Sequence, residues 1–175
     1  WHAAQRAWLQ TLIAWSKAQP DLVARMFPPP RTPARLPGVS VLICSIDPAR
    51  FAAVTASYRQ RFAGWPLEIV GVHDARSLAE GYNRAAAQAT GDLLLFSHDD
   101  VELVTPDFAA RLAAHLERFD GVGVAGASSL LRPRWSDAGQ RAIHGHVLHA
   151  PPPGHGGALL MAFGFQQPVC EGIRV

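Results

Sequence analysis

The 175-residue chain has little of what defines several large classes of protein. Its two cysteines, Cys44 and Cys170, are too few for a disulfide framework and lack the spacing of a zinc motif. No apolar run approaches the roughly 18 residues that a membrane helix needs. These shortages argue against disulfide-rich and membrane-spanning proteins, and a reducing cytoplasm is the simplest compartment.

Charge is also scarce. Charged residues make up 17% of the chain and the formal net charge is +2, whereas a nucleic-acid-binding domain usually carries a clustered basic face. All the basic residues except Lys17 are arginine, which indicates coding bias rather than phosphate recognition. The composition therefore predicts no nucleic-acid partner.

The chain falls into three segments. In residues 1–27 a stripe of tryptophan and leucine at helical spacing predicts an amphipathic helix that packs on a neighbouring domain. Prolines are frequent in residues 28–37, which predicts a stiff linker. Residues 38–175 form the third segment. Because the first residue is Trp1 and no leader-like segment is present, we expect a piece of a longer protein.

Beyond residue 38, short apolar runs alternate with helical patterns. Signals that start helices lie between the runs, as Asp47-Pro48, Ser77 with Glu80, and Thr105-Pro106. This alternation predicts right-handed crossovers and an α/β fold, an open and mostly parallel sheet with helices on both faces. The predicted strands are residues 39–45, 67–73, 92–97 and 122–127.

The pattern weakens after Ser128. Residues 132–157 are rich in proline, glycine and histidine, which predicts a long loop. Two further strands are expected over residues 158–165 and 169–175.

Polar side chains follow three of the predicted strands at their carboxyl ends, where open parallel sheets bind ligands. Asp99 and Asp100 are adjacent carboxylates that repel each other unless a positive charge lies beside them. A hard cation such as Mg²⁺ or Mn²⁺ prefers carboxylate oxygens and would neutralise a diphosphate. The side chains at these strand ends are Ser45, Asp47, His73, Asp74, His98, Asp99 and Asp100.

Four stretches, in order, resemble a family 2 glycosyltransferase of the GT-A fold. They are VSVLICS at 39–45, HDA at 73–75, SLAEGYNRAAAQATGD at 77–92 and LLLFSHDDVEL at 93–103. The last is similar to the Asp-x-Asp region that ends a hydrophobic strand in these enzymes, with histidine in place of the first acid. The set is most similar to a bacterial subgroup of glycosyltransferase-like domains related to a streptomycin-biosynthesis protein.

The resemblance implies transfer of a sugar from a nucleotide-diphosphate donor, a UDP- or dTDP-sugar, to an unknown acceptor with inversion at the anomeric carbon. It implies that Ser45 and Asp47 line the nucleotide pocket and that Asp74 binds the base. Asn83 and Arg84 would face the nucleotide or the diphosphate.

The resemblance also implies a divalent cation, Mn²⁺ or Mg²⁺. Asp100 would be its ligand with Asp99 beside it, and His98 would bind the metal or form a hydrogen bond. These enzymes carry the catalytic base in a later segment. We therefore expect the fold to be truncated at its C-terminus, the base to lie beyond residue 175, and residues 1–175 to be inactive alone.

Two other functions stay open. Alternate residues of a strand share a face, so His144 and His146 can hold a metal together, and with Asp99 and Asp100 they would form a metal-dependent hydrolase. Further histidines follow at His149 and His155. The third interpretation is a non-catalytic scaffold that binds a nucleotide sugar.

Overall fold

The computed structural model describes residues 33–103, 105–129, 138–139 and 142–144, the backbone of 146–149 and 159–162, and four isolated positions before residue 33. The chain divides into two compact units, Pro29–Arg118 and a second made of Trp1–Pro28 with Phe119–Val175. Most of the helix predicted over 1–27, and the strand predicted over 169–175, lie outside the described residues. Within the described part, no helix combines the length and hydrophobicity that crossing a membrane requires.

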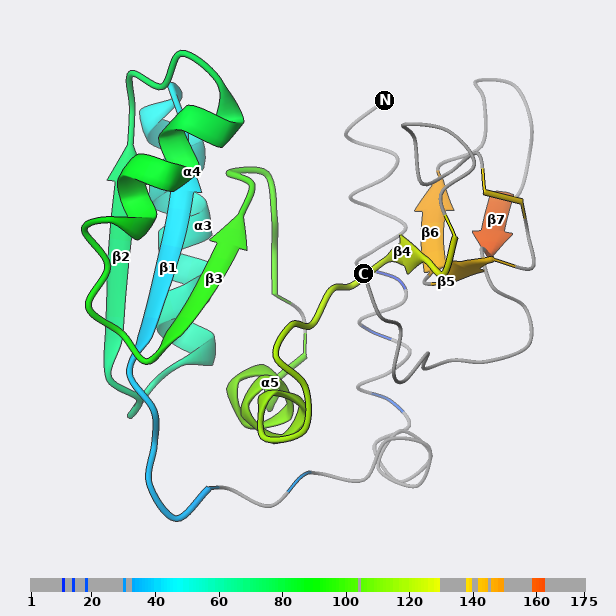
Figure 1. The fold of residues 1–175 in the computed structure, drawn as a ribbon. Helices are drawn as coiled ribbons and strands as arrows, with labels where there is room; N and C mark the ends of the chain where they lie inside the picture. Colours follow the sequence, from blue (N-terminus) through cyan, green and yellow to red (C-terminus); the bar gives the residue numbers. More distant parts are fainter. Residues whose placement is uncertain are drawn as a thin grey trace. The chain divides into compact units, whose positions relative to one another are not determined.

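The unit Pro29–Arg118 is built on three parallel strands, β1 (Val39–Cys44), β2 (Leu67–Val72) and β3 (Leu93–Ser97). Their order is β2-β1-β3, so β1 lies at the centre (Figure 1). Val39 is opposite both Leu67 and Leu93, the first residues of the outer strands. The three strands therefore begin in register and their carboxyl ends share one edge. This confirms the predicted parallel sheet and three of its strands.

Helices cover both faces of this sheet, as predicted. Alternate residues of a strand point to opposite faces, and β1 is apolar on both. Its odd-numbered residues pack against α3 (Pro48–Arg61) and α5 (Phe108–Leu116), whereas Leu42 packs with Ala85 of α4 (Leu78–Ala86). Figure 1 shows α3 and α4 on opposite sides of β1. Every core residue of β1 is at most 1% exposed, which explains its continuous apolar sequence.

The helix starts show how local sequence fixes the strand ends. Asp47 caps α3, because its Oδ1 accepts hydrogen bonds from the amides of Ala49 at 2.8 Å and Arg50 at 3.2 Å. Ser77 caps α4 by accepting from the amide of Glu80 at 3.2 Å. The Glu80 carboxylate reaches back to the amide of Arg76, one residue before the cap. Both helices therefore begin close to the strand that precedes them.

Helix α5 begins later than the sequence predicts. Thr105-Pro106 signals a start there, but the helix begins at Phe108 with Asp107 as its N-cap. The Asp107 side chain makes no capping hydrogen bond. It pairs with Arg111 instead, at 2.7 Å, one turn into the helix. This i,i+4 ion pair takes the carboxylate away from the helix end.

The predicted fourth parallel strand over 122–127 is wrong. Only β4 (Gly126–Ala127) is extended, and it pairs antiparallel with β5 (Ile143–His144). A further pair joins β6 (His146–His149) antiparallel to β7 (Leu159–Ala162), which falls within the predicted strand 158–165. Val124 is 93% exposed. The interleaved glycines explain why the strand predicted over 122–127 does not form, because glycine inside a strand weakens it. The loop predicted over 132–157 is also only partly correct, since β5 and β6 lie within it.

Candidate functional site

Ser45 follows β1 directly and joins the carboxyl ends of all three parallel strands. Its Oγ donates a hydrogen bond to Oδ2 of Asp99, which follows β3, at 2.7 Å. Its carbonyl oxygen accepts from Nδ1 of His73, which follows β2, at 2.8 Å. Ser45 is 4% exposed, so these bonds are largely screened from water. Segments that lie far apart in the sequence thus meet at one buried residue, Ser45.

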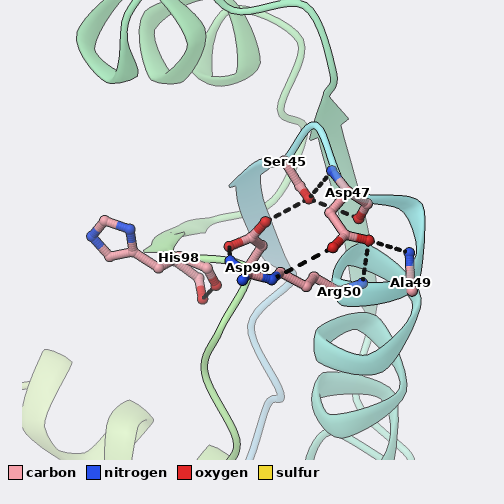
Figure 2. Close-up of polar contacts among 7 residues, drawn as sticks. Ser45, Asp47, Ala49, Arg50, His98 and Asp99 are labelled. Atoms are coloured by element: carbon pink, nitrogen blue, oxygen red, sulfur yellow. Dashed lines mark hydrogen bonds and ion pairs between the residues drawn. The ribbon is translucent and has the colours of Figure 1, made fainter. Parts of the chain in front are cut away.

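Arg50 provides the positive charge beside Asp99. It lies in the first turn of α3, with Nη1 4.0 Å from Oδ1 of Asp99 and Nε 3.5 Å from Oδ2 of Asp47. Asp47 also donates its amide to Oγ of Ser45 at 3.2 Å. Figure 2 shows Ser45, Asp47, Arg50 and Asp99 as one connected group. We call these four residues the strand-end cluster; the sequence analysis named three of them and missed Arg50.

His98 and Asp100 lie beside this cluster without joining it. Both are exposed, and the imidazole of His98 points away from Ser45 and Asp47 (Figure 2). Among the described residues, no three histidine, cysteine or acidic side chains are grouped to hold a metal by themselves. Mg²⁺ is often held by one or two carboxylates together with a substrate's phosphates, and Asp100 is an exposed carboxylate beside this cluster.

A second polar pair lies where β2 leads into α4. Nη2 of Arg84 is 2.6 Å from Oδ1 of Asp74, and Nε of Arg84 is 3.5 Å from Oε1 of Glu80. The Asp74 side chain is 81% exposed. The hydrogen bond from Arg84, followed by its charge, lowers the pKa of Asp74 below its ordinary value. Asp74 is therefore ionised at neutral pH and presents a carboxylate to solvent; Asn83, also predicted here, is exposed on α4.

Helix α4 also fixes the end of β3. The hydroxyl of Tyr82 donates to the carbonyl oxygen of Ser97 at 2.9 Å. Its ring meets Phe96 edge-on, with centroids 5.4 Å apart. Burial raises the pKa of Tyr82, so the phenol stays protonated and able to donate. The residue immediately before His98, Asp99 and Asp100 is thereby held in place.

The predicted histidine pair does not lie on one strand. His144 is the last residue of β5, whereas His146 is the first residue of β6, and the two strands belong to different sheets. The alternation that would place both on one face of a strand is therefore interrupted between them. His155 lies outside the described residues.

Comparison with known proteins identifies the family. A family model described as "Glycosyltransferase like family" matches residues 40–150, more than half of the chain. No curated protein and no solved structure gives a significant match. The matched range includes β2, β3, all of β1 except its first residue, and every residue of the strand-end cluster. The chain therefore belongs to this glycosyltransferase-like family.

Proposed function

Starting from this membership, we propose that the chain binds a nucleotide-diphosphate sugar at the carboxyl edge of β1, β2 and β3 for sugar transfer to an acceptor. One observation carries the proposal: the Ser45 hydroxyl binds Asp99 while its carbonyl binds His73, so three strand ends form one polar site. Open parallel sheets bind their ligands at this edge. The kinship to the streptomycin-related subgroup stays a prediction.

The pair Asp74–Arg84 is the proposed site for the nucleotide. An ionised, exposed carboxylate accepts a hydrogen bond from the ring N–H of uracil or thymine, which supports UDP or dTDP as the donor's nucleotide. Arg84 is 38% exposed and keeps a guanidinium at the same place for a phosphate. Asn83 lies next to it on α4 and is the third residue of this proposal.

The diphosphate is proposed to lie beside the strand-end cluster. Asp100 and His98 would hold a divalent cation, Mn²⁺ or Mg²⁺, whose charge supports departure of the nucleoside diphosphate. Ser45 holds Asp99 through a hydrogen bond next to Asp100, and Arg50 places a positive charge near the other carboxylate oxygen of Asp99. With the diphosphate held from one side, an acceptor oxygen would bond to the anomeric carbon from the opposite side as the bond from that carbon to the diphosphate breaks. A general base would accept the hydroxyl proton, and the configuration at the anomeric carbon would invert.

Calorimetric titration of the 175-residue chain with UDP and with dTDP, with and without Mn²⁺, tests the proposal. We expect Mn²⁺-dependent binding that Asp100→Ala abolishes. The melting temperature should not fall, because Asp100 is exposed and its loss relieves repulsion with Asp99. Asp120→Ala, which removes another exposed acid, is the matched control and should bind as the wild type does.

The other outcomes separate the remaining functions. Binding that persists in Asp100→Ala with unchanged Mn²⁺ dependence would refute the metal assignment. A chain that binds neither nucleotide contradicts both the proposed transferase and a scaffold that binds a nucleotide sugar. Stoichiometric zinc in the purified chain, found by elemental analysis without nucleotide, would favour a hydrolase.

A further inference from the structure

The imidazole of His73 reaches from the end of β2 to the end of β1. Its Nδ1 lies 2.8 Å from the carbonyl oxygen of Ser45. A carbonyl oxygen only accepts, so Nδ1 carries the proton in both the neutral and the charged ring. The lone pair of the neutral ring is then on Nε2. The bond to Ser45 is therefore kept whichever charge state His73 adopts.

The imidazole ring of His73 packs against Phe51 and beside Gly71. The rings of Phe51 and His73 meet edge-on, with centroids 4.8 Å apart and planes at 84°. A Cβ at Gly71 would lie 2.7 Å from Cζ of Phe51 and 3.0 Å from Nε2 of His73. Any side chain at position 71 would thus displace both rings. The absence of a side chain at Gly71, the second-last residue of β2, makes room for the imidazole.

His73 and β2 together fix the peptide groups of Ser45. The amide of Ser45 donates to the carbonyl of Val72 at 3.0 Å, and its carbonyl accepts from His73. With both peptide groups held, the Ser45 Oγ lies 2.7 Å from Oδ2 of Asp99 and 3.0 Å from the carbonyl oxygen of Asp47. Its single hydrogen favours the nearer acceptor, which is charged. The influence of His73 on Asp99 therefore passes through Ser45.

We infer that His73 is a positioning residue of the donor site: it holds Ser45 so that the Ser45 hydroxyl orients Asp99 next to Asp100, the proposed cation ligand. The inference rests on the proposed function. It concerns a residue that contacts the strand-end cluster from outside and has a role apart from base recognition by its neighbour Asp74.

Two substitutions of His73 separate the contribution of its hydrogen bond from that of its ring packing. His73→Phe keeps an aromatic ring against Phe51 but removes the donor. His73→Asn keeps a donor, because the amide nitrogen of asparagine is bonded to Cγ as Nδ1 of histidine is. Without the bond from His73, Ser45 has to be ordered when UDP binds. The net contribution of one hydrogen bond sets the upper limit of that cost, so we expect His73→Phe to bind UDP more weakly by up to about tenfold. His73→Asn should recover most of this loss.

A double-mutant cycle with Ser45→Ala tests whether the effect passes through the Ser45 hydroxyl. Alanine keeps the carbonyl that His73 binds but loses the group that binds Asp99. In the Ser45→Ala background, His73→Phe should cause no further loss of UDP affinity. Equal losses in both backgrounds would indicate general destabilisation and overturn the inference, as would wild-type affinity in His73→Phe itself.

Nitrogen-15 NMR of the His73 ring supplies a readout that needs no ligand. We expect the neutral ring to carry its proton on Nδ1; a proton on Nε2 would overturn the inference. If the wild-type chain binds no UDP, the proposed function fails and the positioning role with it. An Nδ1 proton would then still show that the His73–Ser45 bond exists, so the two failures are distinguishable.

Discussion

Single residues at the two ends of the parallel sheet have different roles. At the carboxyl end, Ser45 links three strands through its hydroxyl and carbonyl groups. At the amino end, Glu68 accepts hydrogen bonds from the hydroxyl of Ser40, from the amide of Thr90 at 2.9 Å and from its hydroxyl at 3.1 Å. The Ser45 bonds lie at the edge proposed to bind the ligand, whereas the Glu68 bonds hold the amino end of the sheet together.

Glu68 makes the folding stability of the domain depend on pH. The hydrogen bond from Ser40, followed by that from the Thr90 amide, lowers the pKa of Glu68 in the folded state. Its contribution to stability is therefore complete above the pKa of the unfolded chain, about 4.3, and is lost as the pH falls through the lower folded-state pKa. We expect Glu68→Gln to unfold at lower urea than the wild type at pH 6, with the difference shrinking at more acidic pH.

Urea unfolding followed by circular dichroism at pH 6, 4 and 3 measures this. Glu117→Gln, which changes an exposed glutamate at the end of α5, is the control. The difference in urea midpoint between this variant and the wild type should not shrink with falling pH as it does for Glu68→Gln. A gap between Glu68→Gln and wild type that stays constant from pH 6 to pH 3 would contradict the assignment.

At the scale of elements, the close approach of β1 to the turn before β3 requires glycine at position 91. A Cβ there would lie 2.7 Å from the amide nitrogen of Ser40 and 2.9 Å from the carbonyl carbon of Val39. Because backbone atoms of a central strand cannot move aside easily, we expect Gly91→Ala to destabilise the domain by about 1–3 kcal/mol. Chemical denaturation measures the change.

Gly121→Ala is the matched control for this prediction. Nothing lies within 4 Å of a Cβ at position 121, so the same substitution there should leave the free energy of unfolding close to that of the wild type. Equal effects at the two positions would show that the crowding around Gly91 does not matter to stability.

Local sequence predicted the elements wherever one signal dominated. The apolar run 39–45 predicted β1, and the Asp47-Pro48 pair predicted the start of α3. Where two signals competed, the prediction failed. Val122 and Val124 favour a strand, but the glycines between and after them do not. At α5, the Asp107 carboxylate pairs with Arg111 instead of capping the amides of the first turn. The sequence alone does not show which of these two partners Asp107 takes.

At the scale of the whole molecule, the parallel topology made part of the site predictable. Once three strands run in parallel, their carboxyl ends share an edge, so Ser45, Asp47 and Asp99 were expected there from the sequence. Which groups bind one another was not predictable, because the Ser45–Asp99 bond joins residues 54 positions apart. Arg50 was missed as a site residue, and His73 was expected at this edge but given no role, for the same reason: their roles depend on contacts between segments.

The central claim is that the carboxyl edge of β1, β2 and β3 is the ligand-binding edge. Backbone amide NMR shifts, followed while UDP and the diamagnetic cation Mg²⁺ are added to the 175-residue chain, test this most directly. The account predicts that the changes concentrate at residues 45–50, 73–76 and 97–100. Changes that instead concentrate at the amino ends of the strands, residues 38–40, 67–68 and 91–93, would contradict it.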